Sequence, residues 1–199
     1  MVEKISVVPD GVVLAGGVGR RMGGGKASVE LDGEALVCRA VDILNQVCRR
    51  VVVAGRPEVA LPPDLRAEVV YDQAGWAGPV AGIAVGLAAL TADDVLVLAC
   101  DLPMAGPAIQ RLAEARAGCA IMCVSEDGPQ PLCARLPRER GLEVARRLLA
   151  ESVPAARALL RELAAEELTC PAEWLTNLNS PEDVQRVDIL LDQQSQAAR

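Results

Sequence analysis

Residues 16–26 form the segment of this chain whose residue types and spacing are best suited to chemistry. The segment holds six glycines and three cations, Arg20, Arg21 and Lys26, and it directly follows the apolar run 11–14. Glycine lets a backbone approach a ligand closely, and successive loop N–H groups can bind phosphate oxygens beside cationic side chains. The segment therefore predicts a nucleotide-binding loop. The alternative is a flexible surface loop, which has no need of three cations at the end of a strand.

The spacing excludes two common phosphate-binding loops. A Walker A loop requires a glycine five residues before Gly25, where Arg20 stands, and a hydroxyl residue at the position of Ala27. A dinucleotide-binding fingerprint begins at Gly17, but Met22 occupies the place of its third glycine. The loop therefore belongs to neither class.

Composition and charge narrow the class of protein. A chain of 199 residues is expected to be one domain over residues 1–199. Only 2% of the residues are aromatic, so stacking platforms for single-stranded nucleic acid are not expected, and a net charge of −7 argues against nucleic-acid or anionic-membrane partners. No apolar run approaches the ~20 residues of a membrane-spanning helix. Residues 1–10 are not typical of a signal peptide, so a cytoplasmic protein is predicted.

The chain contains seven cysteines and no histidine. Its closest cysteine pair is Cys119-x-x-x-Cys123, which would place both thiols on one face of a strand. This spacing does not predict a zinc site, and the cysteines are interpreted as small buried residues of a cytosolic chain. Without histidine, Ser-His-Asp and Cys-His catalysis are excluded. Any catalysis must use carboxylates, lysine, arginine, backbone amides or a metal ion.

Short β-branched runs alternate with Ala- and Leu-rich helical patterns along the chain. The predicted strands span residues 11–15, 50–54, 68–71, 95–100, 120–124 and 132–136. The predicted helices span residues 34–46, 80–90, 107–117, 139–150, 155–163 and 181–191. This alternation predicts a Rossmann-like, three-layer α/β/α sandwich with a mostly parallel sheet.

Ligands of such sheets bind at the carboxyl ends of the strands. The glycine-rich loop, residues 54–56, Asp72 and Asp101 all follow predicted strands, so we expect them to lie together. For Asp72 the alternative is a strand-terminating turn residue.

Asp101 is the best candidate for a metal ligand. It follows a fully apolar strand, and a carboxylate at that place suits Mg²⁺, which binds one or two carboxylates together with substrate phosphates. The alternative is a cap for the helix that begins near Pro107, but six residues is too far for a cap. Asp93 and Asp94 lie at the other end of the same strand and are predicted to be solvated turn residues.

The pattern Leu-Ala-Gly-Gly-x-x-x-Arg-Met-Gly-x-x-Lys over residues 14–26 resembles the signature of nucleotidyltransferases of the sugar-nucleotide pyrophosphorylase type. Within them the chain is most similar to the molybdenum cofactor guanylyltransferases. The later segments that extend the resemblance in the same order are Asp72 with 78–83, 99–103, 130–132 and 177–183. The likeness thus covers nearly the whole chain, and the segments 78–82 and 177–183 narrow it to the guanylyl branch.

This resemblance implies a transferase that joins GMP from GTP to molybdopterin, releases pyrophosphate and uses Mg²⁺. A transient contact with molybdenum cofactor enzymes is implied as well. The alternatives are a molybdopterin cytidylyltransferase, another small-molecule nucleotidyltransferase, and a nucleotide-binding regulatory module without catalysis.

The resemblance also implies roles for single residues. Lys26 and Arg21 would contact the triphosphate and the leaving pyrophosphate, Asp101 would bind the metal ion, and Asn177 and Asn179 would line the pterin side of the cleft. The nucleotide-binding residues would be Leu14, Ala15, Gly16, Gly17, Gly19, Arg20, Lys26, Gly55, Asp72, Gly78, Pro79 and Gly82. The chain departs from the family pattern at Gly25, where an acidic residue is usual, and at Ala54 or Gly55, where a polar residue is frequent.

Two helix starts flank these segments. Pro79 suits a first helical turn, whose free N–H groups and partial positive charge would favour a phosphate. Ser180 is interpreted as the cap of a helix that starts at Pro181, with Glu182 and Asp183 in its first turn.

Overall fold

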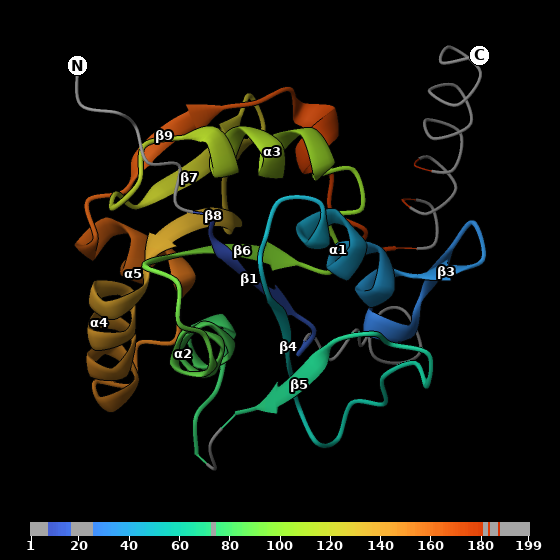
Figure 1. Ribbon diagram of the computed structural model, residues 1–199, viewed down its shortest axis with the longest axis horizontal. Coiled ribbons are helices and arrows are strands. Elements are labelled where there is room, and N and C mark those ends of the chain that lie inside the picture. Colours follow the sequence, from blue (N-terminus) through green and yellow to red (C-terminus); the bar gives the residue numbers. More distant parts are fainter. Residues whose placement is uncertain (1–7, 17–25, 73–74, 181–182, 184–186, 188–199) are drawn as a thin grey trace.

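A seven-stranded sheet with helices on both faces forms the centre of the protein (Figure 1). The computed structural model describes residues 8–16, 26–72, 75–180, 183 and 187. The strands are β1 (Asp10–Leu14), β2 (Glu30–Leu31), β3 (Glu34–Ala35), β4 (Val51–Gly55), β5 (Glu68–Tyr71), β6 (Asp94–Ala99), β7 (Ile121–Ser125), β8 (Gly128–Pro137) and β9 (Glu166–Thr169). The helices are α1 (Leu36–Asn45), α2 (Pro79–Ala89), α3 (Gly106–Glu114), α4 (Arg138–Ala150) and α5 (Ala156–Glu162), with short 3₁₀ turns η1 (Lys26–Ser28) and η2 (Ala172–Leu175).

The strand order of the main sheet is β5-β4-β1-β6-β8-β7-β9. Strand β1 pairs in parallel with β4 on one side and β6 on the other, and β4 pairs in parallel with β5. Strand β8 is antiparallel to both of its neighbours, while β9 runs parallel to β7. The predicted mostly parallel sheet is confirmed. From β1 the chain runs outward to β4 and β5 on one side, and through α2 it returns to β6 on the other side of β1. This reversal of strand order makes the carboxyl ends of β1 and β6 a topological switch point.

The central strands are buried on both faces, so alternate residues enter different cores. Val12 and Val97 pack with α2, α4 and α5 on one face, whereas Val13 and Leu98 pack with α1 and α3 on the other. Figure 1 shows the two helical layers on opposite sides of the sheet. The predicted three-layer α/β/α sandwich is therefore confirmed.

The predicted strands and the predicted helices up to residue 163 are present, with shifted ends. Strand β8 begins four residues before its predicted start at Leu132, and α1 starts at Leu36 because Glu34 and Ala35 pair with β2. Strand β9 was not predicted, since its sequence Glu-Glu-Leu-Thr carries two charges at the sheet edge. Of the predicted helix over 181–191, only residues 183 and 187 are described, and both are helical.

Two glycines of helix α2 face β1, and a side chain at either position would press on the strand. A Cβ atom on Gly86 would lie 2.4 Å from Val12 Cγ2, and one on Gly82 would lie 3.0 Å from Leu14 Cδ2. Both glycines are on the same face of the helix, one turn apart. Their missing side chains set the distance between α2 and the end of β1.

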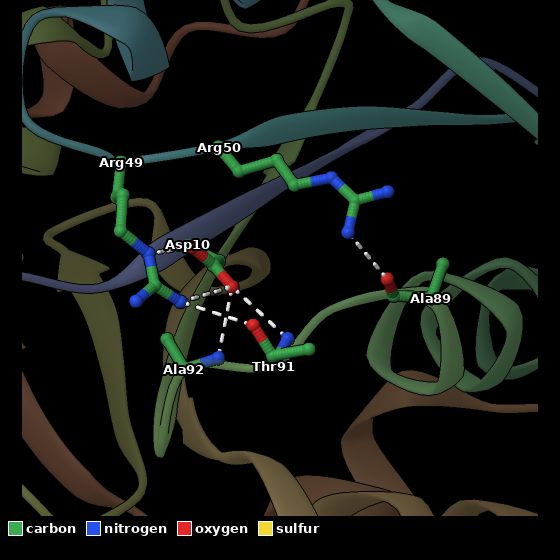
Figure 2. A network of polar contacts seen from close by, with 6 residues as sticks. All are labelled: Asp10, Arg49, Arg50, Ala89, Thr91 and Ala92. Carbon is green, nitrogen blue, oxygen red and sulfur yellow. Dashed lines mark hydrogen bonds and ion pairs between the residues drawn. The ribbon is translucent and has the colours of Figure 1, made fainter.

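A buried carboxylate joins the amino end of β1 to its neighbours (Figure 2). Asp10 is fully buried and accepts hydrogen bonds from the backbone N–H groups of Thr91 and Ala92 at 3.1 and 2.8 Å. The guanidinium of Arg49 donates to both Asp10 oxygens at 3.3 Å. Burial raises the pKa of Asp10, but these hydrogen bonds outweigh it and the pKa lies below its usual value.

The amino end of β6 carries a second buried pair. Asp94 and Arg135 are each 1% exposed, and their side chains meet at 2.8 Å. Gly118 N–H also donates to Asp94, while Arg135 Nη1 donates to the carbonyls of the last turn of α3. The prediction of a solvated Asp94 is wrong, because β8 places an arginine beside it; Asp93 is exposed, as predicted.

The cysteines show a second correction. Cys119 precedes β7, so it does not share a strand face with Cys123. Instead Cys123 Sγ lies 3.6 Å from Cys133 Sγ of β8. All seven cysteines are free thiols. Over the described ranges no helix is long and apolar enough to span a membrane.

Candidate nucleotide-binding site

A cavity of about 280 Å³ lies at the carboxyl ends of the central parallel strands. Its lining comes from the ends of β1, β4 and β6, the residue after β5, the start of α2 and one residue of β8. The lining residues are Leu14, Gly16, Ala54, Arg56, Asp72, Gly78, Pro79, Gly82, Ala99, Cys100, Asp101 and Leu132. Most of this surface is apolar, and its charged side chains are Arg56, Asp72 and Asp101.

The structure brings most of the described nucleotide-binding candidates together around this cavity. The predicted residues that line it are Leu14, Gly16, Asp72, Gly78, Pro79, Gly82 and Asp101. Two others are placed elsewhere. Ala15 is fully buried and its N–H donates to the carbonyl of Ala54 at 2.9 Å. A side chain on Gly55 would meet Val69 and Leu61 rather than the cavity.

Part of the predicted phosphate-binding loop lies outside the described residues. This applies to Gly17, Gly19, Arg20 and Arg21, and also to Gly25. Lys26 begins the 3₁₀ turn η1, but its side chain is likewise not described. The roles that the resemblance implies for these residues remain predictions.

Arg56 is a site residue that was not among the predicted ones. Its Nε lies 3.6 Å from Asp72 Oδ2, and the two side chains are 24% and 12% exposed. The stem of Arg56 passes Gly16, where a Cβ would lie 3.5 Å from the arginine. The sequence placed residues 54–56 at a strand end, but it could not show that the arginine turns toward Asp72.

The Asp72 carboxylate has a shifted acidity. Burial raises its pKa above the usual value, the charge of Glu58 adds to that rise, and the Arg56 guanidinium opposes it. Asp72 is therefore an ionisable group in an apolar setting, with one arginine beside it.

Asp101 is tied to the segment that was predicted to face the pterin. Its carbonyl accepts a hydrogen bond from Leu178 N–H at 2.9 Å, and Leu178 is fully buried. Asn177 is half-buried and Asn179 is exposed on either side of it, and neither lines the cavity. Helix α3 starts at Gly106 with Ala105 as its cap, so Asp101 is not a helix cap.

The predicted cap at Ser180 is confirmed. Asp183 N–H donates to Ser180 Oγ at 3.3 Å, and the Asp183 carboxylate accepts from the N–H groups of Asn179 and Ser180 at 2.9 and 3.0 Å. This reciprocal arrangement is a capping box with aspartate as the acid. It fixes the chain direction just after Asn179.

The start of α2 differs from the expectation. Gly78 has a φ of +75°, and a Cβ there would lie 2.7 Å from Pro154 Cβ, so only glycine fits. The N–H groups of Val80 and Ala81 already donate to the carbonyls of Pro154 and Gly78. These two amides are therefore not the free donors on which the phosphate interpretation of this helix end depended.

Comparison with known proteins shows the family of this chain. The model of the MobA-like NTP transferase domain matches residues 11–168 of this chain. The chain belongs to the MobA-like NTP transferase family.

Individual relatives agree with this family. A molybdenum cofactor guanylyltransferase from Shewanella piezotolerans is 30% identical over 128 residues, which are 62% of this chain and 63% of that protein. The matched part thus spans less than two thirds of that relative's length.

Two solved structures share the fold. A molybdopterin-guanine dinucleotide biosynthesis protein A from Archaeoglobus fulgidus superposes with a TM-score of 0.71 at 22% identity, covering 92% of this chain and 99% of that one. A 2-C-methyl-D-erythritol 4-phosphate cytidylyltransferase from Thermus thermophilus gives 0.70 at 17% identity, covering 92% and 98%. Proteins named for a guanine dinucleotide and for cytidylyl transfer therefore share this fold, so the fold alone does not identify the base.

Among the described residues no group of three or more His, Cys, Asp or Glu side chains could hold a metal ion by itself. Asp101 lines the cavity just after β6, whereas Asp72 is paired with Arg56. Mg²⁺ commonly uses one or two carboxylates and completes its shell with water and phosphate oxygens, so the single carboxylate of Asp101 would suit it.

Proposed function

We propose that this protein transfers GMP from GTP to molybdopterin, forming molybdopterin guanine dinucleotide and releasing pyrophosphate. The observation that carries the proposal is the cavity at the carboxyl ends of β1, β4 and β6. It gathers predicted nucleotide-binding residues from three separate segments of a MobA-like chain, together with the predicted metal ligand Asp101 from a fourth. The guanylyltransferase names of the relatives support the choice of base and acceptor.

The reaction needs little covalent work from the protein. A phosphate oxygen of molybdopterin attacks the α-phosphorus of GTP in line, a new P–O bond forms, and the bond to the β-phosphate oxygen breaks. Pyrophosphate leaves with the electron pair. Because the attacking phosphate is already anionic, the absence of histidine is no obstacle. The protein supplies position and charge.

The proposed roles combine the position of Asp101 in the cavity with the family resemblance of residues 14–26. Asp101 would hold Mg²⁺ beside the phosphates, and Lys26 and Arg21 would contact the triphosphate. When bound, Mg²⁺ would neutralise phosphate charge as a Lewis acid. The hydrogen bond between Leu178 and the Asp101 carbonyl supports a pterin side formed by Asn177 and Asn179, because it links that segment to the metal residue.

The proposed setting is the cytoplasm, with hand-over of the product to molybdenum enzymes. Seven free thiols agree with a reducing compartment. The hand-over is tested by loading a purified apo-molybdoenzyme with product in the presence and absence of this protein.

A turnover assay tests the proposed activity. The purified protein is mixed with molybdopterin, Mg²⁺ and either GTP or CTP, and pyrophosphate release is measured together with the dinucleotide product. We expect turnover with GTP. Turnover with CTP alone would replace the proposal by the cytidylyltransferase. GTP binding without turnover under any condition would replace it by the regulatory module.

A further inference from the structure

Arg56 and Asp72 form an ion pair in the cavity lining, and the proposed function has so far given this pair no role. Arg56 follows β4 and Asp72 follows β5, so the two neighbouring parallel strands deliver them side by side. Both side chains line the cavity and both are largely buried. Arg56 is the only arginine among the described residues that line the cavity.

The protonation state of a carboxyl group decides which base it can recognise. An ionised carboxylate only accepts hydrogen bonds, and guanine offers two adjacent donors, N1–H and the N2 amino group. A protonated carboxyl has one donor and one acceptor, which matches N3 and the N4 amino group of cytosine. A carboxylate in a base pocket therefore favours guanine only while it stays ionised.

We propose that Arg56 is a specificity-determining positioning residue: its ion pair holds the Asp72 carboxylate ionised and oriented to accept both donors of the guanine edge. This inference rests on the proposed function, since it assumes that the base of the nucleotide reaches Asp72. Arg56 acts through Asp72 and is not required to touch the nucleotide itself.

The charges around Asp72 explain why it needs the arginine. Burial opposes its ionisation, and Glu58 from the segment after β4 opposes it further. Asp101 brings a second carboxylate to the same cavity from the end of β6. Arg56 is the charge that works in the other direction.

The chain offers a matched control on the same two strands. Arg50 precedes β4 and Glu68 begins β5, and their side chains form an ion pair at the amino ends of these strands. Arg50 also donates to the carbonyl of Ala89 (Figure 2). This pair is more exposed and lies outside the cavity lining, so Arg50→Met removes an equivalent arginine without touching the site.

The experiment measures GTP and CTP dissociation constants by calorimetry between pH 5 and pH 8.5, with Mg²⁺ present. The variants are Arg56→Met, Arg56→Lys and Arg50→Met, each checked for an intact fold by circular dichroism. In the parent protein the preference for GTP narrows as the pH falls, because protonated Asp72 no longer accepts both donors. In Arg56→Met we expect the preference for GTP to narrow at a higher pH than in the parent. At neutral pH the ratio of the CTP to the GTP dissociation constant should be about tenfold smaller than in the parent.

Two further results are required. Arg56→Lys keeps a cation and should retain most of the parent pH profile, and Arg50→Met should match the parent throughout. If Arg56→Met weakens GTP and CTP equally at every pH, the arginine contacts phosphate and the inference is overturned. An unchanged preference in a folded Arg56→Met protein overturns it as well.

Failure of the proposed function would look different. It would appear in the parent protein, which would then bind CTP as tightly as GTP at neutral pH before any substitution is made. A parent that prefers GTP and transfers GMP, with variants that keep the parent pH profile, would leave the proposed function standing and remove only the role of Arg56.

Discussion

At the amino ends of β1 and β6, Asp10 and Asp94 are buried and enclosed by hydrogen-bond donors, whereas at the carboxyl ends of β5 and β6 Asp72 and Asp101 border the cavity. Strand β6 thus has an aspartate near each end. The amino-end carboxylates are held by backbone N–H groups and an arginine, which leaves no room for a ligand. The carboxyl-end pair stands where ligands of open α/β sheets bind.

This contrast shows that residue type alone does not distinguish a carboxylate enclosed in the fold from one that borders the cavity. What distinguishes them here is the end of the strand at which they stand. Two arginines illustrate the same point. Arg135 binds Asp94, two carbonyls of α3 and the carbonyl of Ala115 just after it, while Arg56 pairs with Asp72 beside the cavity.

The largest expected effect follows from removing Asp101. We expect Asp101→Asn to lower Mg²⁺-dependent pyrophosphate release on the order of a thousandfold, because the variant would lose the proposed ligand that holds the phosphate-neutralising cation. The free energy of unfolding should stay within about 0.5 kcal/mol of the parent. Steady-state kinetics and urea unfolding measure the two quantities. A variant with near-parent turnover would remove Asp101 from the metal role.

At the amino end of β6, a substitution should change stability most. Asp94→Ala leaves Arg135 buried without its partner, so we expect a loss of about 3–5 kcal/mol in unfolding free energy. Asp93→Ala is the matched control, since the exposed neighbour should change stability by no more than about 0.5 kcal/mol. Urea unfolding of both variants measures the difference. Equal stabilities would show that the buried pair contributes nothing beyond a solvated aspartate.

The close contact of α2 with β1 should give an intermediate effect. A Cβ on Gly86 would overlap Val12, so Gly86→Ala is expected to cost about 1–3 kcal/mol of stability. Gly106→Ala is the control, because nothing lies within 4 Å of its Cβ position. At the cavity end, Gly82→Ala presses only on the flexible tip of Leu14 and should cost less than Gly86→Ala. The reverse order in thermal unfolding would contradict this account.

Much of this contrast could be predicted from the sequence, because strand ends can be read from apolar runs. Consecutive apolar residues such as 95–99 mark strands buried on both faces, and the residue after such a run must lie at the carboxyl edge. That reasoning predicts that Asp72 and Asp101 lie together at this edge, and both line the cavity. It also gave the parallel sheet and its helical layers.

The rest depended on contacts between distant segments. Asp94 can be buried because it pairs with Arg135, which lies 41 residues later in the chain. Arg56 lines the cavity because its side chain turns toward Asp72. At the start of α2, the N–H of Val80 donates to the carbonyl of Pro154, which lies in the connection before α5. No local pattern announces such partners, since each pairing is set by the tertiary arrangement of the strands.

The smallest expected effect concerns pH. The pKa of Asp10 is lowered, so its contribution to stability is present above the ordinary aspartate pKa of about 3.9 and is lost as the pH falls through the folded pKa. Asp10→Asn should therefore be less stable than the parent by about 1–2 kcal/mol at pH 7. The difference should shrink as the pH falls below the ordinary aspartate pKa, because protons then bind Asp10 more tightly in the unfolded parent than in the folded one.

For Asp72 the pH dependence of stability should have the opposite sign. Its pKa is raised, chiefly by burial, so its ionised form costs folding free energy at neutral pH, and this cost is relieved as the pH falls through the raised pKa. Relative to the parent, Asp72→Asn should thus lose stability between pH 7 and pH 3, while Asp10→Asn gains it over the same range. Urea unfolding at pH 7, 5, 4 and 3 gives both differences. Slopes of the same sign would mean that the two ends of the strands do not hold their carboxylates in different electrostatic environments.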